Sequence, residues 1–156
     1  MTNRLMSTHI VFVTVPFETT LLVRDTCLCL HVQRAARALA RRFDEALKPV
    51  GLTNGQFSLL MSLNRPSPAA MKGVAELLAM DRTTLTAAVK VLERRRLLKV
   101  AVDPDDRRGR LLTLTAAGQG KLAAAMPAWR LHHRQLEALL RDPGALRRDL
   151  GTLAGL

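Results

Sequence analysis

Residues 24–48 contain neither glycine nor proline, and their apolar side chains recur at every third or fourth position. This spacing predicts one long amphipathic helix that ends before Pro49 and Gly51. Its apolar positions are Leu28, Val32, Ala35, Leu39, Phe43 and Ala46. Only 3% of the 156 residues are aromatic, so a core must be largely aliphatic, which favours packed helices.

Polar N-cap residues indicate where further helices begin. Thr53 precedes a helix that stops before Asn64, and Asp81 precedes a helix over residues 82–95. A short helix over about 70–79 comes directly before Asp81, so this pair forms a helix-turn-helix candidate. The last two predicted helices are a long one from Thr115 to about residue 140 and a short one over 145–153, after Asp142-Pro143-Gly144.

The apolar period changes after this helix-turn-helix candidate. The segments 98–102 and 111–115 are apolar and β-prone, and they flank the charged stretch 103–110. This arrangement predicts a β-hairpin with a charged tip. The expected fold class is therefore mainly α with a small β-hairpin wing, in which a winged helix-turn-helix over about 53–115 lies between dimerisation helices over about 24–48 and 116–155.

Residues 1–23 are predicted to lie outside this single domain of 24–156, either as a disordered arm or as an over-extended start. The apolar run Ile10–Phe17 is short, β-prone and interrupted by Pro16. No stretch approaches the roughly 18 apolar residues that a membrane span requires. We therefore expect a cytoplasmic protein without a membrane partner.

The charge balance points to a polyanionic partner. The chain has 24 Lys and Arg against 13 Asp and Glu, a formal net charge of +11. Residues 81–110 hold nine Lys or Arg and five Asp or Glu, a local net charge of +4. Counterion release from phosphates then favours nucleic acid. A nonspecific architectural binder needs only this charge, whereas an enzyme is not expected, because no catalytic motif or phosphate-binding glycine loop is present.

The helix over 82–95 and the hairpin tip carry the candidate DNA contacts. Thr83, Ala87, Lys90 and Arg94 fall opposite the apolar stripe Leu85, Val89 and Leu92, with Thr86 at the edge. Short hydroxyl side chains and cations on one helix face are typical of major-groove contacts. At the tip, Asp carboxylates can hold Arg guanidinium groups for minor-groove entry. The candidate residues are Arg82, Thr83, Thr84, Thr86, Lys90, Arg94, Arg107, Arg108 and Arg110.

The sequence resembles the MarR (multiple-antibiotic-resistance regulator) family over about residues 24–155. The most specific segments are 80–86, 91–95 and 103–110, the last leading into Leu112-Thr113-Leu114-Thr115-Ala116-Ala117-Gly118. The resemblance implies a homodimer, joined by its terminal helices, that reads a palindromic operator in double-stranded DNA. It implies minor-groove insertion by Arg108 with Asp106 as its orienting residue. Ala87 stands where many relatives carry an Arg or another long polar residue, so we expect a different operator preference. Asp105 stands where an Arg is common, which lowers the positive charge of the wing.

The resemblance leaves the controlling signal open. Cys27 and Cys29 lie where peroxide-sensing relatives place a reactive cysteine, with Cys29 the closer match, but small core-packing cysteines are the favoured alternative. On one continuous helix their side chains would point about 200° apart, which argues against a bridge between them. The alternative signal is a small aromatic or anionic ligand in a cleft at His31, Arg34 and Arg37. We expect no metal site and no cofactor, because two ligands such as Cys27 and His31 do not form a zinc site.

Overall fold

The computed structural model describes residues 14–155, which divide into two compact units, residues 14–37 and 38–155. The first unit holds α1 (Phe17–Thr26) and the beginning of α2 (Leu28–Leu47). The second holds the remainder of α2 and all later elements. Within residues 14–155, no helix is long and apolar enough to cross a membrane.

The prediction of one uninterrupted helix over 24–48 is wrong at its start. Cys27 has an extended backbone, with φ −70° and ψ 105°, and separates α1 from α2. The Thr26 hydroxyl donates to the Leu22 carbonyl at 2.7 Å, a local bond of the kind that competes with helix continuation. Because Cys27 lies between two helices, the helical geometry that argued against a bridge to Cys29 does not apply. Residues 17–23 of the expected arm are helical, and Ile10–Val13 lie outside the described residues.

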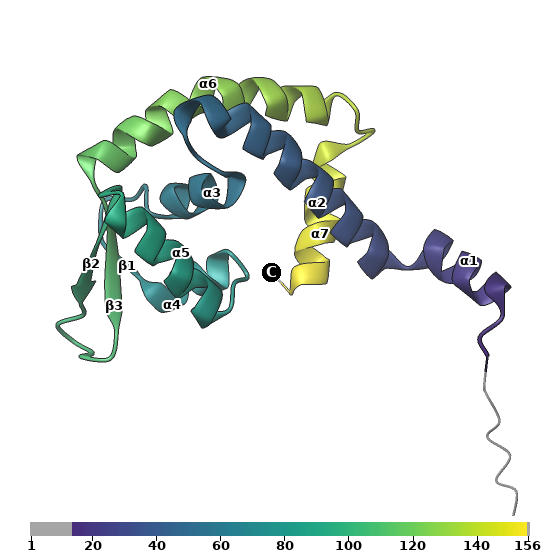
Figure 1. Ribbon diagram of the computed structural model, residues 1–156, viewed down its shortest axis with the longest axis horizontal. Helices are drawn as coiled ribbons and strands as arrows, with labels where there is room; N and C mark the ends of the chain where they lie inside the picture. The colour runs from purple at the N-terminus through teal and green to yellow at the C-terminus, as the bar shows by residue number, and fades with distance from the viewer. Residues whose placement is uncertain (1–13, 156) are drawn as a thin grey trace, which may run out of the picture. The chain divides into compact units, whose positions relative to one another are not determined.

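The second unit has the predicted mainly α architecture with a small sheet (Figure 1). Its capped helices begin where the sequence indicates: Thr53 accepts from the Gln56 amide in a capping box, and Thr115 accepts from the Gly118 amide. After α2 the elements are a 3-10 turn η1 (Lys48–Val50), α3 (Asn54–Ser62), β1 (Ala69–Ala70), α4 (Met71–Leu77), α5 (Arg82–Arg94), β2 (Leu98–Val102), β3 (Arg110–Leu114), α6 (Ala116–Glu137) and α7 (Pro143–Ala154).

The sheet confirms the predicted hairpin and adds one strand to it. The strand order is β1-β3-β2, with Leu98 opposite Leu114 and Ala69 opposite Leu112 in antiparallel pairs. The two-residue strand β1 was not predicted, because it is too short to show an alternating pattern and forms only by pairing with β3. The helix expected over 70–79 accordingly spans only Met71–Leu77.

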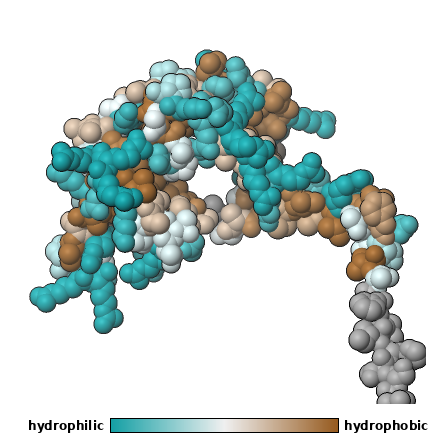
Figure 2. Space-filling view, in the orientation of Figure 1, coloured by the Kyte–Doolittle hydropathy of each residue, from teal (hydrophilic) through white to brown (hydrophobic). Residues whose placement is uncertain are grey.

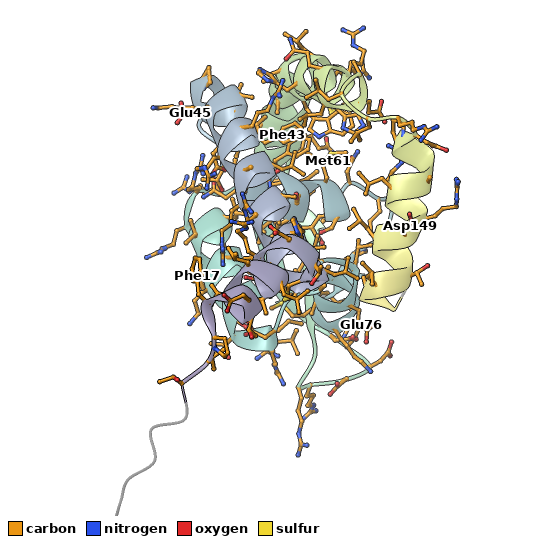
Figure 3. All side chains as sticks on the ribbon, turned by 90° about the vertical axis from the view of Figure 1, so that its right-hand side faces the viewer. Phe17, Phe43, Glu45, Met61, Glu76 and Asp149 are labelled. Carbon is orange, nitrogen blue, oxygen red and sulfur yellow. The ribbon has the colours of Figure 1, made fainter. Side chains whose placement is uncertain are left out.

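One aliphatic core joins the helices and the sheet of the second unit. Figure 3 shows Phe43 of α2 on the side that faces the other helices and Glu45 projecting away from them, in agreement with their burial. The most deeply buried large side chains are Leu47, Leu59, Leu60, Leu85, Leu92, Leu98 and Leu112. The apolar stripe of α2 enters this core only near its end, since Leu28, Val32 and Leu39 are exposed in the single chain.

Candidate nucleic-acid interface

The start of α5 is fixed by its N-cap residue. Asp81 accepts hydrogen bonds from the Thr84 amide at 2.8 Å and from the Thr84 hydroxyl at 2.5 Å. These bonds, the hydroxyl bond first, lower the pKa of the Asp81 carboxyl below its ordinary value because they favour the ionised form. The preceding turn has Ala79 in the left-handed region, with φ 49°, and the Met80 amide donates to the Ala75 carbonyl. The second helix of the helix-turn-helix therefore begins at a defined point.

The outward face of α5 agrees with the sequence prediction. Leu85, Val89 and Leu92 are buried, and the opposite side is exposed at Thr83, Ala87, Lys90 and Arg94. Arg82 is also exposed, in the first turn.

The three threonines of this helix differ in what their hydroxyl groups can still donate. The Thr84 hydroxyl donates to Asp81, and the Thr86 hydroxyl donates to the Arg82 carbonyl at 2.7 Å. Within residues 14–155, the Thr83 hydroxyl has no internal hydrogen bond. Thr84 and Thr86 can therefore only accept from an added ligand, whereas Thr83 can donate or accept.

The wing is shaped by backbone hydrogen bonds to its own aspartates. Asp106 accepts from the Arg108 amide at 2.9 Å through its carboxylate and from the Gly109 amide at 2.7 Å through its carbonyl. The Asp103 carboxylate accepts from the Asp105 amide at 3.0 Å. A Cβ atom at Gly109 would lie 3.0 Å from Asp103 Cβ and from the Asp106 carbonyl oxygen, so a side chain there would require these neighbours to move by a few tenths of an ångström.

The expected carboxylate-to-guanidinium contact takes another form. Asp106 contacts the backbone of Arg108 and thereby shapes the loop, because the short side chain closes a turn on its own segment. The Arg110 guanidinium donates to the carbonyls of Gly109 at 2.7 Å and Arg107 at 3.2 Å, so it braces the tip. In the described part of the chain, the guanidinium groups of Arg107 and Arg108 have no ion pair or hydrogen bond and are exposed. Figure 2 shows hydrophilic side chains projecting from this hairpin.

A contact that sequence reasoning missed lies at the other end of α5. The Arg95 guanidinium donates to the Gly51 carbonyl at 2.7 Å and to Gln56 Oε1 at 2.9 Å. These partners are 44 and 39 residues away in the chain, and no local pattern connects them.

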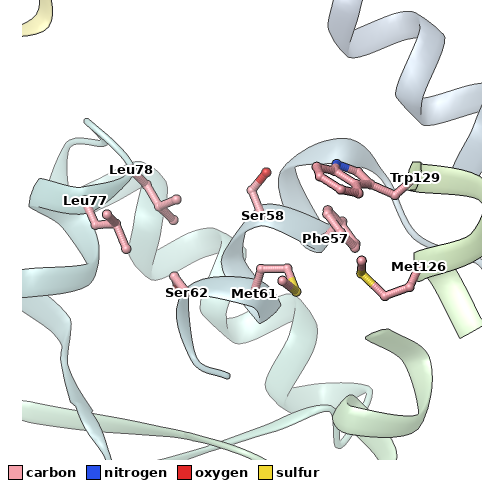
Figure 4. A pocket seen from close by; sticks show the side chains of 8 residues that line it. All are labelled: Phe57, Ser58, Met61, Ser62, Leu77, Leu78, Met126 and Trp129. Carbon is pink, nitrogen blue, oxygen red and sulfur yellow. The ribbon is translucent and has the colours of Figure 1, made fainter. Parts of the chain in front are cut away.

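An apolar cavity of about 370 Å³ lies among α3, α4 and α6. Figure 4 shows Phe57, Met126 and Trp129 together on one side and Leu77 and Leu78, at the end of α4, on the other. Met61, Ser58 and Ser62 complete the lining. The cleft residues expected from the sequence do not line this cavity.

Those residues and the cysteines lie on α2 or at its start. His31 Nε2 is 3.3 Å from the Asp25 carbonyl, and Arg37 donates to Gln33 Oε1 at 3.1 Å. Arg34 is exposed. Cys27 is half-buried and Cys29 is exposed, with Gln33 Nε2 3.2 Å from its sulfur. Among the described residues, no three His, Cys, Asp or Glu side chains are grouped for a metal ion.

A basic exposed helix face after a tight turn, next to an arginine-tipped hairpin, defines a winged-helix DNA-binding protein. A family model described as the MarR family matches residues 50–109. The structure of the Mycobacterium tuberculosis regulator MosR in complex with DNA is similar, with a TM-score of 0.77, 36% identity, and 83% of this chain and 94% of MosR covered. The chain belongs to the MarR family and is a DNA-binding transcription regulator, not an enzyme.

Two further relatives differ in the direction of regulation that their names state. The transcriptional repressor CouR was solved bound to a 23-mer DNA duplex, and this structure matches with a TM-score of 0.69 and 31% identity over 85% of this chain and 94% of CouR. The transcriptional activatory protein BadR of Rhodopseudomonas palustris is 33% identical over 59% of this chain. This match spans only 54% of BadR, about half of its length.

Proposed function

We propose that this chain acts as a homodimeric repressor that binds a palindromic operator sequence-specifically. The observation that carries the proposal is the pairing of an ordered, capped α5 with a wing whose Arg107 and Arg108 side chains are exposed and unpaired within the described residues. A nonspecific charge binder needs neither feature. Phosphate contacts fix position, and side chains at base edges then supply sequence information.

In this proposal, the residues divide by role. Thr83 and the oxygen or methyl groups of Thr84 and Thr86 contact base edges in the major groove, because they are short side chains in the first turns of α5. Arg82, Lys90 and Arg94 contact phosphates. Arg108 enters the adjacent minor groove, and Arg107 contacts the DNA backbone beside it. Arg110 supports the tip through its carbonyl contacts and adds positive charge there.

The homodimer is supported by apolar side chains that the single chain leaves uncovered. Leu146, Leu150 and Leu153 share one face of α7 and are 41%, 40% and 61% exposed, and no residue of α7 is buried. Leu28 and Val32 form a similar exposed stripe on α2. An amphipathic helix buries its apolar face against another surface, and a second copy provides one with two-fold symmetry that matches a palindrome.

The operator proposal is tested by selection from a random pool of duplexes, followed by competition. The expected result is an enriched inverted repeat that competes with labelled operator at least about 100-fold better than random DNA does, within the usual range of specificity ratios. Equal competition by random DNA would instead favour a nonspecific architectural binder. A transcription assay with the selected site in a promoter then distinguishes repression from activation.

The apolar cavity supports release by a small ligand. Its lining is aromatic, aliphatic and hydroxyl-bearing, without a charged side chain, so it favours an aromatic compound over an anionic one. Leu77 and Leu78 lie four and three residues before Asp81, so a ligand that displaces the end of α4 also displaces the start of α5. Titration with naphthol and naphthoate, followed through Trp129, the only tryptophan, tests this role. We expect naphthol to change the fluorescence of Trp129 and to release the operator. If neither compound changes the fluorescence or the operator binding, the ligand proposal is contradicted.

Cysteine oxidation is a second candidate signal, and the interruption of the helix at Cys27 favours it. Cys27 has an extended backbone and lies two positions before Cys29, so the two side chains are not held apart as they would be on a continuous helix. Peroxide would then join the two sulfurs, each thiol losing one hydrogen as the peroxide is reduced to water. Thiol-reversible loss of operator binding in the parent, but not in Cys29→Ser, supports this control. Unchanged binding after complete oxidation contradicts it.

A further inference from the structure

Arg95 lies at the junction between the proposed reading helix and the wing. It is the residue directly after α5, and the next residue, Arg96, has a left-handed backbone with φ 59° before β2 begins at Leu98. Any movement of Arg95 therefore changes both the end of α5 and the start of the hairpin.

The Arg95 guanidinium holds this junction to a distant part of the fold. One nitrogen, Nη2, donates to the Gly51 carbonyl at 2.7 Å, and the other, Nη1, donates to Gln56 Oε1 at 2.9 Å. Both acceptors are neutral, so the contact acts through the fixed geometry of the guanidinium fork and not through an ion pair.

The two acceptors are themselves fixed in place. Gly51 has φ 68° and closes η1, with its amide donating to the Lys48 carbonyl at 2.9 Å. Gln56 is part of the capping box of α3, where its Oε1 also accepts from the Thr53 amide at 3.2 Å. The guanidinium thus connects the end of α5 to the ordered start of α3.

We propose that Arg95 is a positioning residue for sequence readout, which holds the end of α5 against η1 and α3 so that α5 and the wing engage their two grooves together. This inference rests on the proposed sequence-specific function. The start of α5 is fixed independently by Asp81, so loss of the Arg95 contacts lets the other end of the helix shift without unfolding it. Base contacts depend on this alignment, whereas nonspecific contacts with phosphates tolerate displacement.

The test compares Arg95→Gln with the parent on a duplex selected by the parent and on random DNA, across a salt series. Two hydrogen bonds from the guanidinium to neutral acceptors support an expected loss of about tenfold in affinity for the selected duplex. Affinity for random DNA should stay within about twofold, and the salt slope should be unchanged, because Arg95 is assigned no phosphate. Arg94→Gln, which removes the same charge on the DNA-facing side, should instead weaken binding to both duplexes and lower the salt slope by about one unit.

If Arg95→Gln loses affinity equally for both duplexes and has a lower salt slope, Arg95 is a phosphate contact and the proposal is overturned. Full retention of selectivity by Arg95→Gln also overturns it. If Arg95→Gln does not fold, Arg95→Lys replaces it in the test, because lysine keeps the positive charge but lacks the two donor nitrogens of the guanidinium. Lost selectivity with an unchanged salt slope supports the proposal, and parent-like selectivity overturns it. If the parent itself enriches no sequence, the proposed function fails first, independently of Arg95.

Discussion

The Asp106 carboxylate accepts a hydrogen bond from the Arg108 backbone amide at 2.9 Å and so orders the wing through its main chain. This arrangement leaves the Arg108 charge available to another partner. A carboxylate paired directly with the guanidinium would have to give up that contact when DNA binds. The wing is therefore shaped in advance, while its exposed arginines remain available for the minor groove.

Arg108→Ala is expected to weaken operator binding by about 1 to 3 kcal/mol while the fold is retained. The affinity is measured by fluorescence anisotropy on the selected duplex, with circular dichroism to verify folding. Glu76→Ala, an exposed charge on α4, is the control for a change in surface charge. Unchanged affinity for Arg108→Ala would remove the wing from the mechanism.

Lys90→Ala is expected to reduce affinity for selected and random duplexes alike, because a phosphate contact carries no sequence information. The plot of log affinity against log salt should become shallower by about one unit. Thr83→Ala is the matched comparison on the same face, and it should reduce affinity for the selected duplex alone. A salt slope equal to that of the parent contradicts a phosphate contact at Lys90.

The N-cap of α5 predicts a pH dependence of stability. The pKa of Asp81 is lowered in the folded chain by the hydrogen bonds from Thr84, so the ionised carboxylate stabilises the fold above the unfolded pKa. That contribution is lost as the pH falls through the folded pKa, below about pH 4. Asp81→Asn keeps a cap but cannot titrate, so the difference in urea unfolding free energy between parent and variant should change only in acid.

The control for this pH effect is Asp105→Asn in the wing, an exposed aspartate. This variant removes one surface carboxylate and leaves the cap of α5 unchanged. A difference for Asp81→Asn that stays constant from neutral pH to about pH 3 would contradict a lowered pKa at the cap.

Gly118 lies where α6 packs closely against Leu97 and the end of β3. A Cβ atom there would lie 2.1 Å from the Leu97 carbonyl oxygen and 2.7 Å from Leu114 Cδ1. Gly118→Ala should lower the unfolding free energy by about 1 to 3 kcal/mol or more, because backbone must move. Gly120→Ala, on the same helix with nothing within 4 Å, should stabilise the chain slightly. Thermal unfolding compares them, and equal midpoints for the two variants would exclude the close contact.

Local signals predicted the parts of the fold that local interactions build. The caps at Thr53, Asp81 and Thr115 and the buried stripe of α5 each depend on residues within one or two turns. The strand β1 depends on pairing with β3, more than 40 residues later, and so left no pattern in its two alanines. Arg95 is likewise 44 and 39 residues from its acceptors Gly51 and Gln56.

The break at Cys27 and the apolar cavity were also not predictable from the sequence. No glycine or proline marks the break, and the flanking residues are compatible with a helix. The cavity depends on how α3, α4 and α6 pack, which sequence spacing does not determine. The expected ligand residues on α2 rest on resemblance alone, and the side chains that line the apolar cavity lie on α3 and α6 and at the end of α4.

Competition between selected and random duplexes, measured by anisotropy with the purified parent chain and with Thr83→Ala, tests the central claim most directly. The account predicts that the parent prefers the selected duplex by at least about 100-fold and that Thr83→Ala reduces this preference without weakening random binding. If the parent binds both duplexes equally, α5 does not read sequence, and the basic surface acts through charge alone.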